Sequence, residues 1–154
     1  MIITVVGEAK TGIEEMIEEL GKLMYFEVLV NEECPKMTDN SEINASLYSD
    51  YYRNDRAYMF VITDKKYIDR LPENSKVVLF TASLEDKERA WKIPFNGWIP
   101  FWFKLKLKRE HGCFDSVKSD LHFVLNDVSP EKQAKQIFKL IHEITGDQLF
   151  MRHI

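Results

Sequence analysis

The chain has 154 residues, of which 45% are hydrophobic and 30% charged, and it holds two cysteines, Cys34 and Cys113. This composition fits one globular domain and excludes collagen-like, disordered and disulfide-stapled chains. No apolar run approaches the ~20 residues of a membrane-spanning helix. The N-terminus shows no basic region or cleavage site, so we expect no signal peptide, no transmembrane segment and a cytoplasmic location.

Charge is unevenly distributed although the formal net charge is only −4. Acidic side chains dominate residues 1–50, whereas basic side chains outnumber acidic ones in residues 51–109. Such a division is typical either of two faces with different partners or of ordinary solvated surface.

Continuous apolar runs predict strands that are buried on both faces. These runs cover residues 2–6, 26–30, 57–63, 76–81 and 122–126. Between them the apolar spacing changes to three and four residues, which is typical of helices with one buried side.

Such helical spacing covers residues 13–24 and 129–144, while Ser83 begins a third helix with capping-box spacing. A short helix is also expected between residues 40 and 52. The alternation of strands and helices predicts one three-layer α/β domain, P-loop- or Rossmann-like, with a mostly parallel five-stranded sheet.

The turn after the first strand is where ligands of such sheets bind. It begins at Gly7 and ends at Gly12, which is the glycine spacing of a phosphate-binding loop. The next two residues of that loop are normally a lysine for the phosphates and a Ser or Thr for Mg²⁺. This chain has Ile13 and Glu14 instead. An apolar residue cannot neutralise phosphate, and a glutamate repels it.

In a second register the N-terminal segment resembles the deviant Walker A ATPases, the ParA/MinD group with its pilus-assembly and conjugation relatives. Their motif is K-G-G-x-x-K-[ST], and here Lys10 matches the signature lysine, Gly12 matches the second glycine, and Thr11 replaces the first. Glu15 and Met16 occupy the positions of the phosphate-binding lysine and the magnesium hydroxyl.

Two further positions fit this resemblance. Asp64 ends an apolar strand as a Walker B aspartate does, and Asn126 ends the fifth predicted strand and is followed by a helix, as the late-strand Asn of the family is. The resemblance implies a pseudo-ATPase that keeps the fold and has lost hydrolysis, because both registers lack the loop lysine. Alternatively, the two glycines only shape a tight turn and no nucleotide binds.

The segment 91–109 contains all three tryptophans and many of the basic residues. Lysine and leucine alternate near its end, which predicts a strand with one cationic and one apolar face. The segment is either a lid or edge hairpin over the sheet, a surface for a protein partner, or a surface for nucleic acid or membrane. The candidate partner-binding residues are Trp98, Phe101, Trp102, Phe103, Lys104, Lys106, Lys108 and Arg109.

Other catalytic signatures are weak. His111 and Cys113 are too few ligands for zinc, so no metal is expected, and a small buried thiol is the default for Cys113. The acids Asp64, Asp69 and Asp127 lie at or after strand ends, where an enzyme would keep them, although aspartates are also common there as turn and cap residues.

The sequence therefore predicts a non-catalytic interaction or regulatory module, a pseudo-ATPase scaffold of a larger bacterial-type assembly with a protein partner. Its candidate nucleotide- or anion-binding residues are Gly7, Lys10, Thr11, Gly12 and Asp64. No cofactor is expected, with ATP or GTP as the possible exception. The alternatives are a small nucleotide- or phosphometabolite-processing enzyme, and an adaptor for nucleic acid or membrane through residues 98–109.

Overall fold

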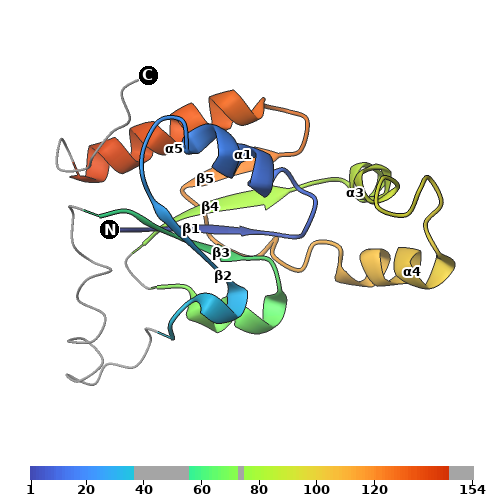
Figure 1. Ribbon diagram of the computed structural model, residues 1–154. Helices are drawn as coiled ribbons and strands as arrows, with labels where there is room; N and C mark the ends of the chain where they lie inside the picture. The colour runs from blue at the N-terminus through green and yellow to red at the C-terminus, as the bar shows by residue number, and fades with distance from the viewer. Residues whose placement is uncertain (37–55, 73–74, 146–154) are drawn as a thin grey trace.

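The sheet of the computed structural model, which describes residues 1–36, 56–72 and 75–145, has five parallel strands. The strand order is β2-β3-β1-β4-β5. Figure 1 shows all five strands pointing the same way, so their carboxyl ends meet at one edge. The strands are β1 (Ile2–Gly7), β2 (Glu27–Val30), β3 (Tyr58–Ile62), β4 (Lys76–Thr81) and β5 (Leu121–Val124). The predicted α/β fold class is confirmed, and the described sheet is parallel throughout.

Helices connect the strands and cover the sheet. They are α1 (Ile13–Leu20), α3 (Leu84–Trp91), α4 (Phe101–Glu110) and α5 (Pro130–Thr145), with short 3-10 helices at Asn31–Glu33 and Lys65–Arg70. The first expected helix ends at Leu20, earlier than expected, although Met24 beyond it is still buried. The helix expected between residues 40 and 52 lies outside the described residues.

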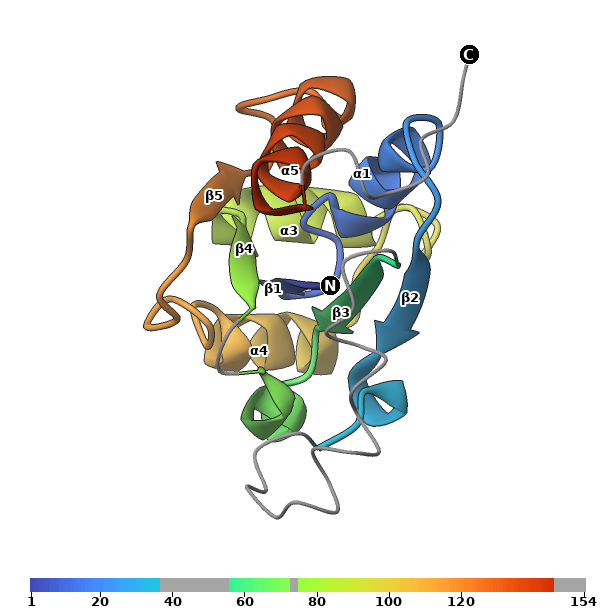
Figure 2. The same cartoon turned by 90° about the vertical axis from the view of Figure 1, so that its left-hand side faces the viewer.

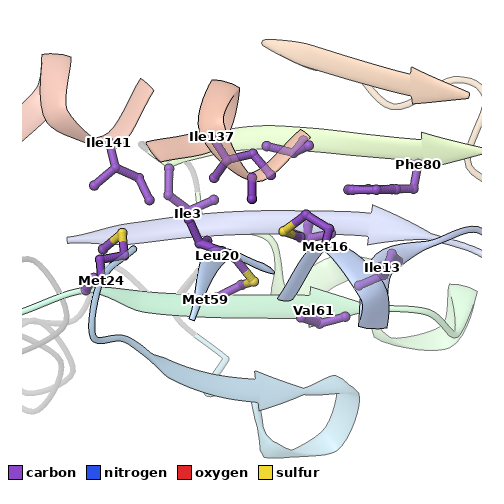
Figure 3. Packing of buried hydrophobic residues seen from close by; sticks show 14 of the residues in the cluster. Ile3, Ile13, Met16, Leu20, Met24, Met59, Val61, Phe80, Ile137 and Ile141 are labelled. Atoms are coloured by element: carbon purple, nitrogen blue, oxygen red, sulfur yellow. The ribbon is translucent and has the colours of Figure 1, made fainter. Parts of the chain in front are cut away.

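The larger core fills the space between one face of the sheet and the pair α1 and α5 (Figure 3). Met16 and Leu20 of α1 and Ile137 of α5 are fully buried in this core. Met16 and Leu20 are four residues apart on α1, as Ile137 and the buried Ile141 are on α5, so one side of each helix is removed from water. Burial of such side chains stabilises the fold by about 2 kcal/mol each.

The opposite face of the sheet has its own core, built on Phe60, Ile62 and Leu79 with Cys34 and Phe114. In Figure 2 the two 3-10 helices and α4 lie on the side of the sheet away from α1 and α5. Because successive side chains of a strand point to opposite faces, a central strand covered on both sides is apolar at every position. This double burial explains the continuous apolar run of β1.

The segment predicted to form a Lys/Leu strand is instead helix α4, and that part of the prediction was wrong. The helix begins after Pro100, and its buried residue Leu107 follows the half-buried Phe103 by four positions, which is helical spacing. The ring of Phe103 packs on Trp91, 4.8 Å away between centroids, and on Phe95 at 4.9 Å. Alternating lysine and leucine residues form a strand only where a neighbouring strand pairs with them, and no strand of the described sheet pairs with this segment.

Candidate functional site

The turn between β1 and α1 has the shape of a tight glycine loop. A Cβ on Gly7 would lie 2.6 Å from the carbonyl oxygen of Phe80 on β4, so only glycine fits there. Gly12 has a φ of 99° and Lys10 a φ of 65°, both in the left-handed region. The hydroxyl of Thr11 donates to the carbonyl oxygen of Glu8 at 2.7 Å and closes the loop.

Two positions of the phosphate-binding motifs are turned into the core: the lysine position of the first register and the magnesium-hydroxyl position of the second. Ile13 and Met16 are both buried against the sheet and α5, and Ile13 is the first residue of α1. Glu14 and Glu15, which stand at the magnesium or lysine positions of the two registers, are exposed. Neither register therefore has the phosphate-binding lysine of the loop.

A cation reaches this loop from elsewhere in the chain. Nζ of Lys87 on α3 donates to both carboxylate oxygens of Glu8, at 2.8 and 2.9 Å. The Lys87 side chain is 0% exposed and that of Glu8 is 16% exposed. The backbone N–H of Gly112 donates to the same carboxylate at 3.2 Å. This pair ties the loop to α3 and to the turn that follows α4.

A cavity of about 490 Å³ lies beside this ion pair, at the carboxyl ends of β1 and β3. Helix α4 forms much of its wall through Phe103, Lys106, Leu107, Arg109 and Glu110. The remaining lining residues are Glu8, Ala9, Thr63, Asp64, Lys65, Lys87, Trp91 and Cys113. The cavity therefore lies where a doubly wound sheet is expected to bind its ligand.

The predicted anion-binding residues divide into three groups. Asp64 lines the cavity and caps the 3-10 helix by accepting the N–H of Lys66 at 3.1 Å. Lys10 lies outside the lining, with its Nζ 5.4 Å from the ring centroid of Trp91. Gly7, Thr11 and Gly12 shape the loop without lining the cavity. The prediction that these residues bind a nucleotide stays a prediction.

A second cavity of about 550 Å³ opens on the other side of Glu8, at the carboxyl ends of β4 and β5. His122 and Thr81 lie in its wall, with Nε2 and the hydroxyl 2.7 Å apart. Glu8 lines both cavities, whereas Lys87 lines only the first.

The sequence analysis missed Glu8 and Lys87. A signal for Lys87 existed, because it occupies the position between Leu84 and Trp91 where the helical period requires an apolar residue. A lysine at such a position needs a buried partner. Glu8 carried no comparable signal, since a glutamate in a loop is ordinary surface.

The predicted partner-binding residues form two sides of α4. Phe103, Lys106 and Arg109 line the cavity, whereas Lys104 and Lys108 are exposed and do not. Trp98 and Phe101 are each 73% exposed and Trp102 is 65% exposed. The segment is therefore both a cavity wall and an open apolar surface.

Within the described residues no group of three or more potential metal ligands occurs. Burial raises the pKa of the Cys34 thiol to about 11. Burial also raises the pKa of Cys113, and the charges of Glu8 and Glu110 add to this shift. At neutral pH these thiols are protonated, which disfavours a nucleophilic role for the cavity residue Cys113.

No family model and no curated protein matches this sequence. Solved structures do resemble the fold. A sugar kinase from Janibacter sp. HTCC2649 superposes with a TM-score of 0.61 at 10% identity, over 97% of this chain and 98% of that one. Shikimate kinase from Acinetobacter baumannii, in complex with shikimate, gives 0.56 at 15% identity over 95% of each chain. The tunicamycin resistance protein of Deinococcus radiodurans gives 0.54 at 12% identity, over 99% and 98%.

Identities this low establish the fold alone. They show that this chain shares its P-loop-like α/β fold with these structures. The narrower resemblance to the deviant Walker A ATPases stays a prediction.

Proposed function

We propose that this domain binds a phosphorylated small molecule, a nucleotide or a phosphometabolite, in the cavity between the sheet edge and α4. The observation that carries the proposal is the concentration of cationic side chains at that edge. Besides the Glu8–Lys87 pair, the lining holds three cations, Lys65, Lys106 and Arg109, against the two carboxylates of Asp64 and Glu110. None of these three cations forms an ion pair with another described residue. A phosphate group would supply the missing counter-charge, and an arginine holds it with two parallel hydrogen bonds.

The apolar wall of the cavity suits the rest of such a ligand. Trp91, Phe103 and Leu107 supply this wall opposite the charged residues. The indole N–H of Trp91 is buried and has no acceptor among the described residues. A buried donor without a partner is costly, so an acceptor brought by a ligand would stabilise this arrangement.

The charges also limit the chemistry. The loop has no lysine for the transferred phosphoryl group, and the buried cation Lys87 is already neutralised by Glu8. Charge that develops in phosphoryl transfer would therefore have to be met by Lys106 and Arg109 from α4. Asp64 is the exposed carboxylate at the end of β3 and, in our proposal, accepts the proton of an acceptor hydroxyl.

Calorimetric titration with ATP, GTP, a sugar phosphate and inorganic phosphate tests the proposal. We expect at least one organic phosphate to bind, with about tenfold weaker binding in Lys106→Ala and Arg109→Ala. Lys108→Ala is the matched control, because this exposed lysine of α4 does not line the cavity. Absence of binding, or equal affinity in all three variants, would contradict the proposal.

A second candidate function is a non-catalytic regulatory module, and the burial of Ile13 at the lysine position of one register and of Met16 at the hydroxyl position of the other favours it. The same titrations combined with a turnover assay separate the two. Binding with turnover that Asp64→Asn abolishes supports an enzyme. Binding without turnover supports a module that senses the ligand.

A further inference from the structure

Helix α4 and the turn before it carry most of the large apolar side chains that the described part of the chain exposes. Among the eight such residues, five belong to this segment. They are Ile93, Trp98, Phe101, Trp102 and Leu105. Figure 1 shows α3, α4 and the connection between them extending beyond the carboxyl ends of the strands. The exposed apolar surface thus lies at one end of the molecule.

The helix has two apolar sides with different surroundings. Phe103 and Leu107, four residues apart, face the protein and line the cavity. Phe101 and Leu105, also four residues apart, are exposed, and Trp102 lies next to them on the outer side. The inner side accounts for the attachment of α4 to the domain. The outer side is left without a partner among the described residues.

The outer side is flanked by cations. Residues 92–109 contain five basic and no acidic side chains, whereas the chain as a whole has a net charge of −4. Lys104 and Lys108 are exposed and form no ion pair with any described residue. With α3 and Glu110 included, residues 84–110 carry seven basic and four acidic side chains, so this end stays positive on a negatively charged molecule and is the part that an anionic surface would attract.

We propose that this outer side of α4, together with the preceding turn, docks onto an anionic membrane surface. Trp and Phe side chains would enter the boundary between headgroups and acyl chains, while the flanking lysines would contact the anionic headgroups. Long lysine side chains suit this position, because their methylene stems can lie along apolar surface with the charge in water. The attachment is peripheral, since no helix within the described residues is long and apolar enough to cross a bilayer.

Two observations favour a membrane over the other anionic partners. The aliphatic residues Ile93 and Leu105 belong to the exposed set, and such side chains gain from hydrocarbon but cannot stack on nucleic-acid bases. The outer residues Phe101, Trp102 and Leu105 line neither of the two cavities described above, so neither cavity offers them the shape complementarity on which a protein partner relies. A bilayer needs no such shape complementarity.

Co-sedimentation and tryptophan emission with vesicles of phosphatidylcholine plus phosphatidylserine, and of phosphatidylcholine alone, test this proposal. We expect binding and a blue shift with the anionic vesicles, and weak or no binding to the neutral ones. Lys104→Glu/Lys108→Glu should lower the partition coefficient by at least about tenfold. Phe101→Ala/Trp102→Ala should bind less and lose most of the blue shift.

The matched control is Lys132→Glu/Lys139→Glu on α5, which makes the same charge change on another exposed surface, at two lysines that form no ion pair with a described residue. It should bind as the unmodified protein does. Because Lys104 and Lys108 do not line the cavity, the result is independent of the proposed function. Thermal unfolding of each variant shows whether the fold is retained. Trp98→Ala, which removes an exposed side chain outside α4, is measured in the same way.

Failure to sediment with anionic vesicles would overturn the proposal, as would equal loss of binding in the α5 control. Binding of a single-stranded oligonucleotide, without binding to vesicles, would assign the surface to nucleic acid and would equally overturn it. Binding to anionic vesicles that is lost in the α4 variants alone supports it.

Discussion

Glu8 and Lys87 are 79 residues apart in sequence, yet the carboxylate of one and the ammonium group of the other form two hydrogen bonds in the interior of the molecule. The pair connects the loop after β1 with α3. Through the N–H of Gly112 it also holds the turn after α4. The cavity wall that α4 provides is therefore positioned by a charge pair rather than by apolar packing alone.

Breaking this pair should destabilise the protein strongly. We expect Glu8→Gln to lower the free energy of unfolding by about 3–5 kcal/mol, because it leaves the fully buried ammonium of Lys87 without a counter-charge. Lys87→Met should lower the free energy of unfolding by less, because the Glu8 carboxylate keeps some contact with water and still accepts the hydrogen bond from the N–H of Gly112. Urea unfolding measures both changes.

The double variant Glu8→Gln/Lys87→Met is the control for this prediction. Without either charge the desolvation penalty disappears, so it should be more stable than Glu8→Gln alone. Additive losses in the cycle would show that the two side chains do not interact as described.

The protein should not hydrolyse ATP or GTP through its glycine loop. The loop has buried Ile13 where a lysine would stabilise the β- and γ-phosphates, and Glu14 where a hydroxyl would hold Mg²⁺. A magnesium-dependent phosphate-release assay checks this. Turnover that disappears in Lys10→Ala would show that the loop works in its second register and would contradict the prediction.

Much of the fold was predictable because strands buried on both faces appear in the sequence as continuous apolar runs. The run Ile2–Val6 is apolar at every position except the buried Thr4, and the helical spacing of α1 and α5 marks the sides that meet in the core. These patterns are local. Each can be recognised from the order of apolar and polar residues within one strand or helix, without knowing which other element it packs against.

The candidate site was less predictable because it depends on distant contacts. The loop was located from Gly7 and Gly12, but its cation comes from Lys87, which no local motif marks. The secondary structure of α4 was missed for a related reason. Alternating Lys and Leu at 104–108 fits a strand and a helix almost equally, and the choice is made by the packing of Phe103 on Trp91.

Gly7 and Gly12 should respond differently to alanine. At Gly7 the new Cβ would overlap the backbone of β4, so we expect a loss of at least about 2–3 kcal/mol in unfolding free energy. At Gly12 the nearest atom is 3.5 Å away and only the left-handed φ is strained, which costs about 1–2 kcal/mol. Equal losses, measured by urea unfolding, would argue against the close approach of β1 and β4.

The Cys34 thiol should react slowly with iodoacetamide in the folded protein and quickly once the chain is unfolded. Burial raises its pKa from 9.0 to about 11, so little thiolate is present at pH 8. The same shift makes the folded state hold the proton more tightly. The stabilising contribution of this thiol is therefore complete below pH 9 and is lost as the pH rises toward 11.

Cys34→Ala is the control for the pH dependence. In this variant the fall of the unfolding free energy between pH 9 and 11 should be shallower than in the unmodified protein. An identical slope would mean that other groups control this range.

The tryptophans should report an exposed environment although they are clustered. Trp98 and Trp102 are largely exposed, and Trp91 is partly covered by Phe103. We therefore expect red-shifted emission from the isolated protein that iodide quenches strongly. In Trp98→Phe/Trp102→Phe the remaining emission should be bluer and better protected, because it comes from Trp91 alone.

Stability distinguishes an outward surface from a lid. A core aromatic costs about 3–5 kcal/mol when it is reduced to alanine, whereas an exposed one costs little. Trp102 makes an edge contact with Phe103 at 5.7 Å but is otherwise open, so Trp102→Ala should cost less than about 1 kcal/mol. Phe103→Ala is the comparison, because Phe103 packs against Trp91 and Phe95, and it should cost clearly more. If Trp102→Ala proves as destabilising as Phe103→Ala, the outer side of α4 is packed rather than free to bind a surface.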